Sequence, residues 1–411
     1  MKNRYTYYLI SLLLFGSTPL ISQNKIGFVM PEGEKSVEVP FELYSNLIAI
    51  PVTINGYVTL KFILDSGSES AILTEKLFGD LLDLDYVRTM HVSGPGTEDS
   101  INAFVASNIY LSLPGGIKAK GMNMLVLEKD YLQLKKNLGD EIYGIIGHDV
   151  FSRFVVEIDY DELKITFHEP SAFKPRRSYT RMSLEIDESK PYTYSVITQD
   201  GHSDSVKLLI DTGASHAVLL DVRNTEDITV PKKTIDVRLG RGLGGEIPGR
   251  IGRMNYFILD EFCFENILAS IPSEGAYMKA IKRGSRHGTL GGEVLRRFRV
   301  IMDYRHESLY LKKGRHFKEK FDFDMSGLTL SAEGDEFDTL LVKRIRENTP
   351  ADDADIQVGD IILRINGTSF MDTDISDIHN LFRKKDGKKI RLIIYRDGEK
   401  IKRIFHLKQM I

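Results

Sequence analysis

The chain has 411 residues, which is too long for one ordinary domain and predicts two or three. Its hydrophobic content of 42% and charged content of 27% are those of a globular protein, and the formal net charge of −3 implies no global attraction to nucleic acid or anionic membranes. The single cysteine, Cys263, excludes an intramolecular disulfide, and its apolar neighbours predict a buried thiol.

The N-terminus has the pattern of a secretory signal. Lys2 and Arg4 precede an apolar stretch at 9–15, and small residues and a proline follow it. We expect a signal peptide over 1–22, because the apolar core is too short for a stable membrane span. The protein is therefore expected to be exported from a bacterial-type cell, to the periplasm, the cell envelope or the exterior.

Both halves of the chain contain the same short phrase. An alternating run at 47–54 reaches Asn-Gly, and a second strand-like run then ends in "LKFILDSGSES" at 60–70. In the second half, strand-like sequence passes through Asp-Gly and ends in "VKLLIDTGASH" at 206–216. Each copy predicts a β-hairpin whose second strand ends at an acid, Asp65 or Asp211.

The repetition continues downstream at nearly equal spacing. A glycine-rich segment follows each acid, "VRTMHVSGPGTED" at 87–99 and "VRLGRGLGGEIPG" at 237–249. A third block then reads "YGIIGHDVFSRFVVEIDY" in the first half and "HGTLGGEVLRRFRVIMDY" in the second. Three matched blocks in the same order predict two homologous all-β lobes, at 24–170 and 171–316, which we expect to pack about a pseudo-twofold axis.

An acid at the end of a buried strand is costly unless its charge is satisfied or shared. If the lobes pack about such an axis, Asp65 and Asp211 face each other and share one proton. Such a pair can activate a water molecule for attack on a peptide carbonyl, without a metal, a nucleophilic side chain or a cofactor. The turn residues expected to support the pair with amides and hydroxyls are Ser66, Gly67, Thr212 and Gly213.

These motifs resemble the aspartic proteases, both the two-lobed pepsin-like enzymes and the retropepsins. The resemblance covers about residues 40–312, and the later elements Ile145-Ile146-Gly147 and Thr289-Leu290-Gly291 match the family's second motif. The short lobes without disulfides look like fused bacterial retropepsin-type domains. The resemblance implies a monomeric aspartic endopeptidase that acts on polypeptides and needs no cofactor or metal.

The sequence departs from the family in its glycine-rich hairpins. Pepsin-like enzymes close one such hairpin over the substrate with a tyrosine, but neither 87–99 nor 237–249 contains one, so which hairpin is the flap stays open. His91 and Arg241 are interpreted as solvent-exposed. His148 and His287 are interpreted as surface or capping residues, because no second histidine stands at ligand spacing.

The last part of the chain resembles a bacterial-type PDZ domain, expected over 320–411 as a small β-barrel-like domain with two helices. The signature is "PADDADIQVGDIILRING", in which Asp355 stands where the family often has glycine. The resemblance implies that a peptide C-terminus adds as a strand and that Ile375 opens the groove helix. The carboxylate-binding loop is expected at Gly327, Leu328, Thr329 and Leu330.

Two functions from different classes follow. The first is an exported aspartic endopeptidase whose PDZ domain binds peptide C-termini or regulates access. The alternative is a catalytically silent, protease-like scaffold that binds peptides. For the PDZ domain itself, the alternative is a groove occluded by packing against the protease lobes. The basic C-terminal run is interpreted as a solvated face, because no motif supports nucleic-acid binding.

Overall fold

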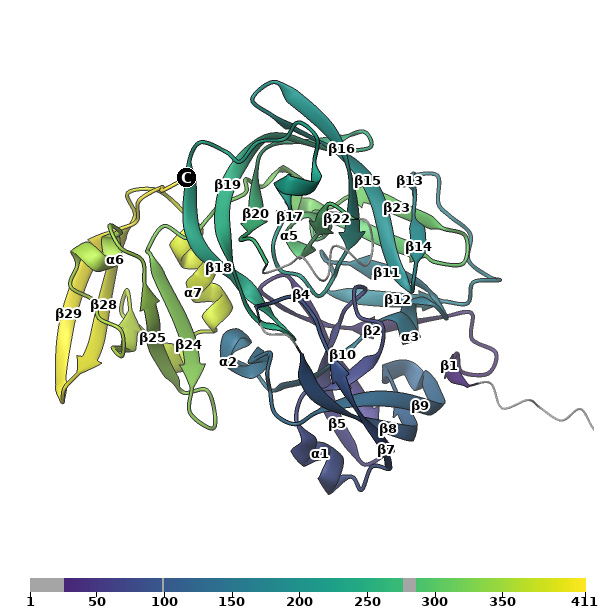
Figure 1. Cartoon of the computed structure of the whole chain (residues 1–411). Coiled ribbons are helices and arrows are strands. Elements are labelled where there is room, and N and C mark those ends of the chain that lie inside the picture. The colour runs from purple at the N-terminus through teal and green to yellow at the C-terminus, as the bar shows by residue number, and fades with distance from the viewer. Residues whose placement is uncertain (1–25, 98–99, 276–285) are drawn as a thin grey trace, which may run out of the picture.

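The computed structural model describes residues 26–97, 100–275 and 286–411, so the predicted signal peptide lies outside the described residues. Strands form four sheets, and the few helices are short (Figure 1). The predicted all-β fold is confirmed. None of the helices in the described residues is long and apolar enough to span a membrane.

A nine-stranded sheet contains most of the first half of the chain, which we call the first lobe. Its strands are β1 (Gly27–Val29), β3 (Glu42–Tyr44), β4 (Leu47–Ile54), β5 (Val58–Leu64), β6 (Ala71–Leu73), β7 (Tyr86–Val92), β8 (Ile101–Ser112), β9 (Lys118–Leu127) and β10 (Ile142–Ile146). Its helices are α1 (Lys76–Leu81), the 3₁₀ turn Pro114–Gly116, α2 (Leu134–Leu138) and α3 (His148–Phe151).

An eight-stranded sheet contains the second lobe. Its strands are β14 (Glu185–Asp187), β15 (Lys190–Gln199), β16 (His202–Ile210), β17 (Val218–Leu220), β18 (Thr234–Gly242), β19 (Gly245–Leu259), β20 (Phe262–Pro272) and β21 (Gly288–Leu290), with a 3₁₀ turn at Val222–Asn224 and helix α5 (Gly292–Leu295). The two sheets share their unusual parallel pairings. β5 pairs with β10 as β16 pairs with β21, and β6 pairs with β9 as β17 pairs with β20.

The predicted hairpins before the two acids are confirmed. Asn55 and Gly56 have φ of 51° and 76°, and Asp200 and Gly201 have φ of 51° and 87°. Two successive positive φ values are those of a type I′ turn, which matches the twist of the flanking strands. Both hairpins therefore use the turn that their dipeptides favour.

A six-stranded sheet joins the lobes, in the order β13-β23-β22-β11-β12-β2. The strands are β2 (Ser36–Pro40), β11 (Val155–Asp159), β12 (Lys164–His168), β13 (Thr180–Ser183), β22 (Phe298–Asp303) and β23 (Ser308–Lys313). Antiparallel pairing of β11 with β22 crosses from one lobe to the other. One hydrophobic core runs through both lobes, so the lobes are fixed relative to each other by burial as well as by hydrogen bonds.

The C-terminal sheet has its own hydrophobic core. Its elements are β24 (Leu328–Glu333), β25 (Thr339–Ile345), α6 (Pro350–Asp353), β26 (Ile361–Ile365), β27 (Thr368–Ser369), α7 (Ile375–Arg383), β28 (Lys389–Arg396) and β29 (Glu399–His406), with a 3₁₀ turn at Phe370–Asp372. A 3₁₀ turn at Arg315–Lys318 precedes this unit and packs on the core of the lobes through Phe317. Asp355 has φ of 52°, a left-handed conformation that explains why glycine suits this position.

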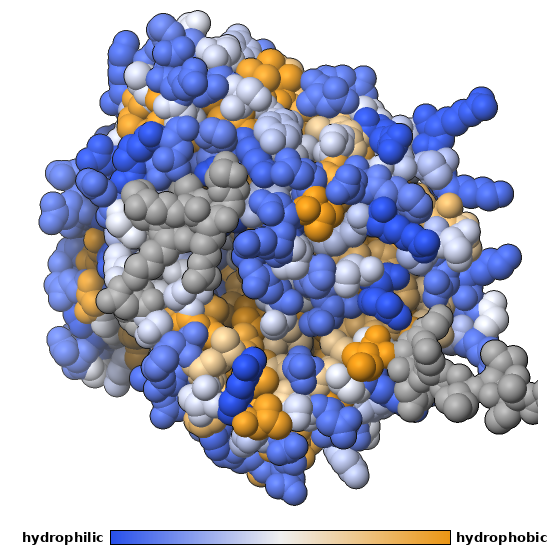
Figure 2. Space-filling model, turned by 45° about the vertical axis from the view of Figure 1, so that its right-hand side comes forward, coloured by the Kyte–Doolittle hydropathy of each residue, from blue (hydrophilic) through white to orange (hydrophobic). Residues whose placement is uncertain are grey.

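The prediction for Cys263 is wrong. Cys263 lies on β20 between the buried Phe262 and Phe264, and its own side chain is exposed. Side chains alternate along a strand, so apolar neighbours on both sides place the middle residue on the opposite face. The face of the molecule shown in Figure 2 is largely hydrophilic, with apolar side chains in separate patches.

Candidate active site

The two predicted acids stand at equivalent strand ends. Asp65 directly follows β5, and its amide donates to the carbonyl of Ile146 on β10 at 2.8 Å. Asp211 follows β16, and its amide donates to the carbonyl of Leu290 on β21 at 3.0 Å. The duplicated parallel pairings therefore hold each acid by the same backbone contact.

Hydroxyl groups cross between the lobes immediately after the acids. The Ser66 amide donates to Thr212 Oγ1 and the Thr212 amide donates to Ser66 Oγ, each at 3.0 Å. Ser66 Oγ also donates to the Ile210 carbonyl and Thr212 Oγ1 to the Leu64 carbonyl, each at 2.7 Å. Both hydroxyl residues are fully buried. This reciprocal set brings the ends of the two acid-bearing strands together and satisfies buried backbone groups on both sides.

The carboxyl groups of Asp65 and Asp211 each lie against the other's turn: a Cβ on Gly67 would be 3.1 Å from Asp211 Cγ, and a Cβ on Gly213 would be 2.3 Å from Asp65 Cγ. Each also accepts a bond at Oδ1 from the amide two residues on, Gly67 at 2.7 Å and Gly213 at 2.9 Å. A Cβ on Gly213 would collide with the carboxyl group of Asp65, so glycine is required by this close approach. The structure thus places all the residues predicted for the two turns at one point between the lobes.

Burial, the neighbouring charge and the hydrogen bond between the two acids raise the pKa of Asp65 well above its usual range. Burial also raises the pKa of Asp211, but the hydrogen bond from Asp65 and the positive charges of Arg286 and Lys190 act in the opposite direction. Two carboxyl groups this close to each other titrate as a pair rather than independently. The cationic side chains favour the proton on Asp65 and the negative charge on Asp211.

The raised pKa values predict how stability depends on pH. Between the ordinary aspartate pKa of about 3.9 and the raised value, the folded protein binds more protons than the unfolded chain. The stabilisation due to protonation is therefore present at acid pH and is lost as the pH rises through this window. We expect Asp65→Asn to be more stable than the wild type at neutral pH and this advantage to shrink toward pH 4.

Denaturation midpoints followed by far-UV circular dichroism measure this difference, since the chain has no tryptophan. Glu38→Gln, at an exposed carboxylate, is the matched control and should show no such dependence. A wild type that is more stable than Asp65→Asn at neutral pH would contradict the buried, proton-sharing pair.

The glycine elements predicted behind the turns lie there. A Cβ on Gly147 would collide with the Asp65 carbonyl oxygen, and a Cβ on Gly291 would collide with the His216 carbonyl oxygen. Each glycine ends the strand that pairs with its acid-bearing strand and begins the short helix α3 or α5. Only glycine fits at these two positions, because the backbone of the acid-bearing turn lies where a side chain would begin.

The two glycine-rich hairpins contact each other at their tips. The amide of Gly244, between β18 and β19, donates to the Pro95 carbonyl of the first hairpin at 3.0 Å, and Leu243 packs against the hydrophobic cluster that contains Ile101. The structure thus gives both lobes a hairpin of the same kind. His91 is exposed as predicted.

The prediction that Arg241 is a plain exposed residue is wrong. Its guanidinium donates through Nη1 to the Tyr131 carbonyl at 3.2 Å and through Nη2 to Glu246 Oε1 at 3.3 Å. The partner carbonyl is 110 positions away in the chain, so local sequence carries no signal for this contact. Arg241 ties the second hairpin to the first lobe.

Tyr304 is a neighbour of the acids that the sequence reasoning did not single out, although the Asp-Tyr pair recurs in both lobes. Burial, together with the negative charges of Asp65 and Asp211, raises the pKa of Tyr304. Its ring stacks on Phe151 of α3, and its hydroxyl has no hydrogen-bond partner among the described residues. Tyr304 therefore brings a buried hydroxyl from the second lobe close to the pair.

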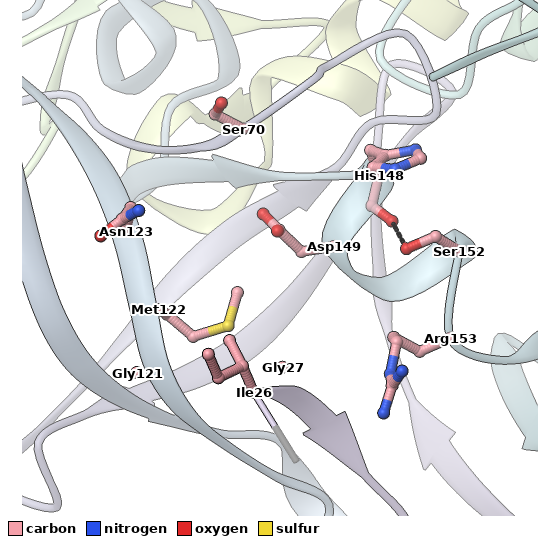
Figure 3. A pocket seen from close by; sticks show the side chains of 10 residues that line it. All are labelled: Ile26, Gly27, Ser70, Gly121, Met122, Asn123, His148, Asp149, Ser152 and Arg153. Carbon is pink, nitrogen blue, oxygen red and sulfur yellow. Dashed lines mark hydrogen bonds between the residues drawn. The ribbon is translucent and has the colours of Figure 1, made fainter. Parts of the chain in front are cut away.

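His148 lies at the start of α3 and lines a cavity of about 400 Å³ (Figure 3). Its Nδ1 contacts the Ser189 carbonyl at 3.0 Å, and the figure shows Ser152 Oγ bonded to the His148 carbonyl. His287 instead accepts the Lys207 amide at 2.9 Å. Within the described residues, no group of three or more His, Cys, Asp or Glu side chains could hold a metal ion.

The predicted carboxylate-binding loop of the C-terminal domain has the expected shape, since Gly327 has φ of 87° and Leu328 begins β24. Its amides already have partners. Ser326 and Gly327 donate to Asp324 Oδ1 at 3.1 and 2.8 Å, and Leu328 donates to Ser326 Oγ at 3.0 Å. Leu330 is buried and Thr329 is exposed. Of the four predicted loop residues, Gly327 therefore gives its amide to the domain's own Asp324 and Leu328 gives its amide to Ser326.

Comparisons with known proteins agree with this organisation. A family model described as aspartyl protease matches residues 50–150, which include Asp65 and Gly147. A family model described as PDZ domain matches residues 341–396. A search of curated proteins finds no match. The chain therefore carries an aspartyl protease domain and, C-terminal to it, a PDZ domain.

Proposed function

We propose that the protein is an exported aspartic endopeptidase, with lobes at 24–170 and 171–316 and a PDZ domain at 320–411. The observation that supports this proposal most is the close approach of the Asp65 and Asp211 carboxyl groups, each against the other's turn, which the reciprocal Ser66–Thr212 bonds hold in place. Because both lobes belong to one chain, a complete pair needs no second copy, and the active species is a monomer.

In the proposed reaction, a water molecule lies between the two carboxyl groups. Asp211 is the ionised member and takes a proton from this water as its oxygen attacks the peptide carbonyl carbon. The protonated Asp65 donates a hydrogen bond to the carbonyl oxygen and stabilises the negative charge that develops there. The proton taken up by Asp211 then passes to the leaving nitrogen as the C–N bond breaks.

The experiment is cleavage of a peptide library by the purified protein, followed by mass spectrometry of the products. We expect internal peptide bonds to be cut and cleavage to be slowed by a transition-state mimic of the pepstatin type. The catalytically silent scaffold would be favoured if the two Asp turns lay apart, whereas the cross-lobe bonds between Ser66 and Thr212 support the peptidase. A library left intact over the whole acid and neutral pH range would favour the scaffold instead.

A further inference from the structure

The resemblance to PDZ domains implies a peptide groove between the edge strand β24 and the helix α7. β24 is the edge strand of its sheet and pairs only with β25 among the described strands. α7 begins at Ile375, and the Phe382 carbonyl near its end accepts the amide of Met325 in the carboxylate loop. The groove therefore runs from this loop toward Ala332 and Ile375.

A segment of the first lobe fills the far end of this groove. α2 packs against β24, as Figure 1 shows. At Gly139, the residue after α2, a Cβ would lie 3.0 Å from Ile375 Cγ2 and 3.6 Å from Ala332 Cβ. Burial, with the charge of Arg383, lowers the pKa of His379, one turn further along α7, to about 4. On this side of the helix, Ile375 is buried and His379 is half-buried.

Polar contacts at the groove's edges hold the same segment. Lys136 Nζ is 2.5 Å from Glu333 Oε2 at the end of β24. On β25, Lys343 Nζ donates to Gln133 Oε1 at 3.4 Å. The PDZ domain also reaches the second lobe, where Arg383 lies 3.9 Å from Glu293. The groove is thus part of an interface with the protease lobes.

The same segment leads to the second hairpin and to the acid pair. The Tyr131 carbonyl, just before Gln133, accepts the bond from Arg241 of β18. After Gly139 the chain enters β10, whose Ile146 carbonyl accepts the Asp65 amide. Burial, and next the positive charge of Arg344 on β25, lower the pKa of Arg238 on this hairpin. One short stretch of chain therefore contacts the groove, the hairpin and the Asp65 strand.

We propose that the PDZ domain is an intramolecular latch: its groove holds residues 133–139 and thereby restrains the hairpin formed by β18 and β19. A peptide that binds the PDZ domain must displace this segment. The chemistry of the displaced contacts selects a segment with a small or apolar residue between Ile375 and Ala332 and a basic residue at Glu333. The Gly327 and Leu328 amides of the loop are already bonded to Asp324 and Ser326, so a peptide carboxylate would have to replace these partners.

The latch is tested first by charge reversal at its edge. Lys136→Glu places the new carboxylate beside that of Glu333. We expect faster hydrogen exchange in β18–β19 and an about two- to fivefold change in the rate of peptide cleavage. Lys136→Glu combined with Glu333→Lys restores the pair and should return both readouts to the wild-type values. The matched control is Lys164→Glu, at an exposed ion pair of 2.9 Å with Glu38 on the sheet that joins the lobes.

A cross-link tests the docked geometry. The Cβ positions of residues 139 and 332 are 3.6 Å apart, within the range for a disulfide. In a Cys263→Ser background, Gly139→Cys with Ala332→Cys should form this bond on mild oxidation. Hydrogen exchange in β18–β19 should then slow, and reduction should reverse the change.

The experiments distinguish failure of the latch from failure of the proposed peptidase activity. Hydrogen exchange can be measured in an Asp65→Asn background, so the latch is tested even where no peptide is cut. The latch is overturned if the bond does not form, or if neither charge reversal nor the cross-link alters exchange in β18–β19. The proposed regulation of cleavage rests on the proposed peptidase. It is overturned if the latch variants, with Asp65 intact, change hydrogen exchange in β18–β19 but cleave peptides at the wild-type rate.

Discussion

Replacing Asp65 or Asp211 by asparagine is expected to lower kcat/KM for peptide cleavage by ~10³-fold or more, because either change removes the shared proton. An asparagine at Asp211 cannot take a proton from water, and one at Asp65 cannot donate a proton to the substrate carbonyl. The asparagine oxygen still accepts the turn amide of Gly67 or Gly213, so the turn geometry is retained. The measurement is steady-state cleavage of a library-derived peptide by each purified variant.

Asp159→Asn provides the matched control. Asp159 is also a buried acid at a strand end, and its Oδ1 accepts amides of the following turn, but it lies on the sheet that joins the lobes. The kcat/KM of this variant should stay within about a few-fold of the wild-type value. If Asp65→Asn or Asp211→Asn cuts as fast as Asp159→Asn, the pair takes no part in the reaction.

Arg297→Met is expected to have the largest effect on stability, about 3–5 kcal/mol, because it breaks a fully buried ion pair without replacing its hydrogen bonds. Arg297 Nη2 is 3.2 Å from Glu293 Oε1, and its guanidinium also donates to the carbonyls of His316, Glu319 and Lys320. The guanidinium lies 3.9 Å from the centre of the Phe321 ring. Arg297 thus anchors the chain that leads from the second lobe to the PDZ domain.

The denaturant midpoint of Arg297→Met, followed by circular dichroism, measures this loss. Arg315→Met is the control, because Arg315 pairs with Asp161 and Glu162 while 65% of its side chain is exposed. Its cost is expected to be about 1 kcal/mol or less. Equal midpoints for the two variants would show that the buried guanidinium contributes no more than a surface charge.

The repeat made the central part of the fold predictable. Each lobe offers the same order of hairpin, acid turn, glycine-rich hairpin and glycine element, and the structure gives each copy the same parallel strand pairings. Asn-Gly and Asp-Gly predict type I′ turns because the left-handed conformations suit those residues. The position of the acids at strand ends was therefore readable from local sequence, and their mutual contact followed from the assumed pseudo-twofold axis.

Contacts between distant segments could not be read in this way. Arg241 looked like a solvent-exposed hairpin residue because its partner, the Tyr131 carbonyl, is supplied by a different lobe. Gly139 looked like an ordinary helix end, yet it fills a groove formed by residues near the C-terminus. Such contacts depend on how whole sheets dock, and no periodicity in the sequence encodes that docking.

The proposed mechanism is tested most directly by the pH dependence of kcat/KM for peptide cleavage. Only the singly protonated pair contains both the base and the acid, so the rate should follow a bell-shaped curve. It should fall at low pH as both carboxyls become protonated and fall again above the raised pKa of the pair as both ionise. A rate that instead rises steadily into the alkaline range would contradict catalysis by Asp65 and Asp211.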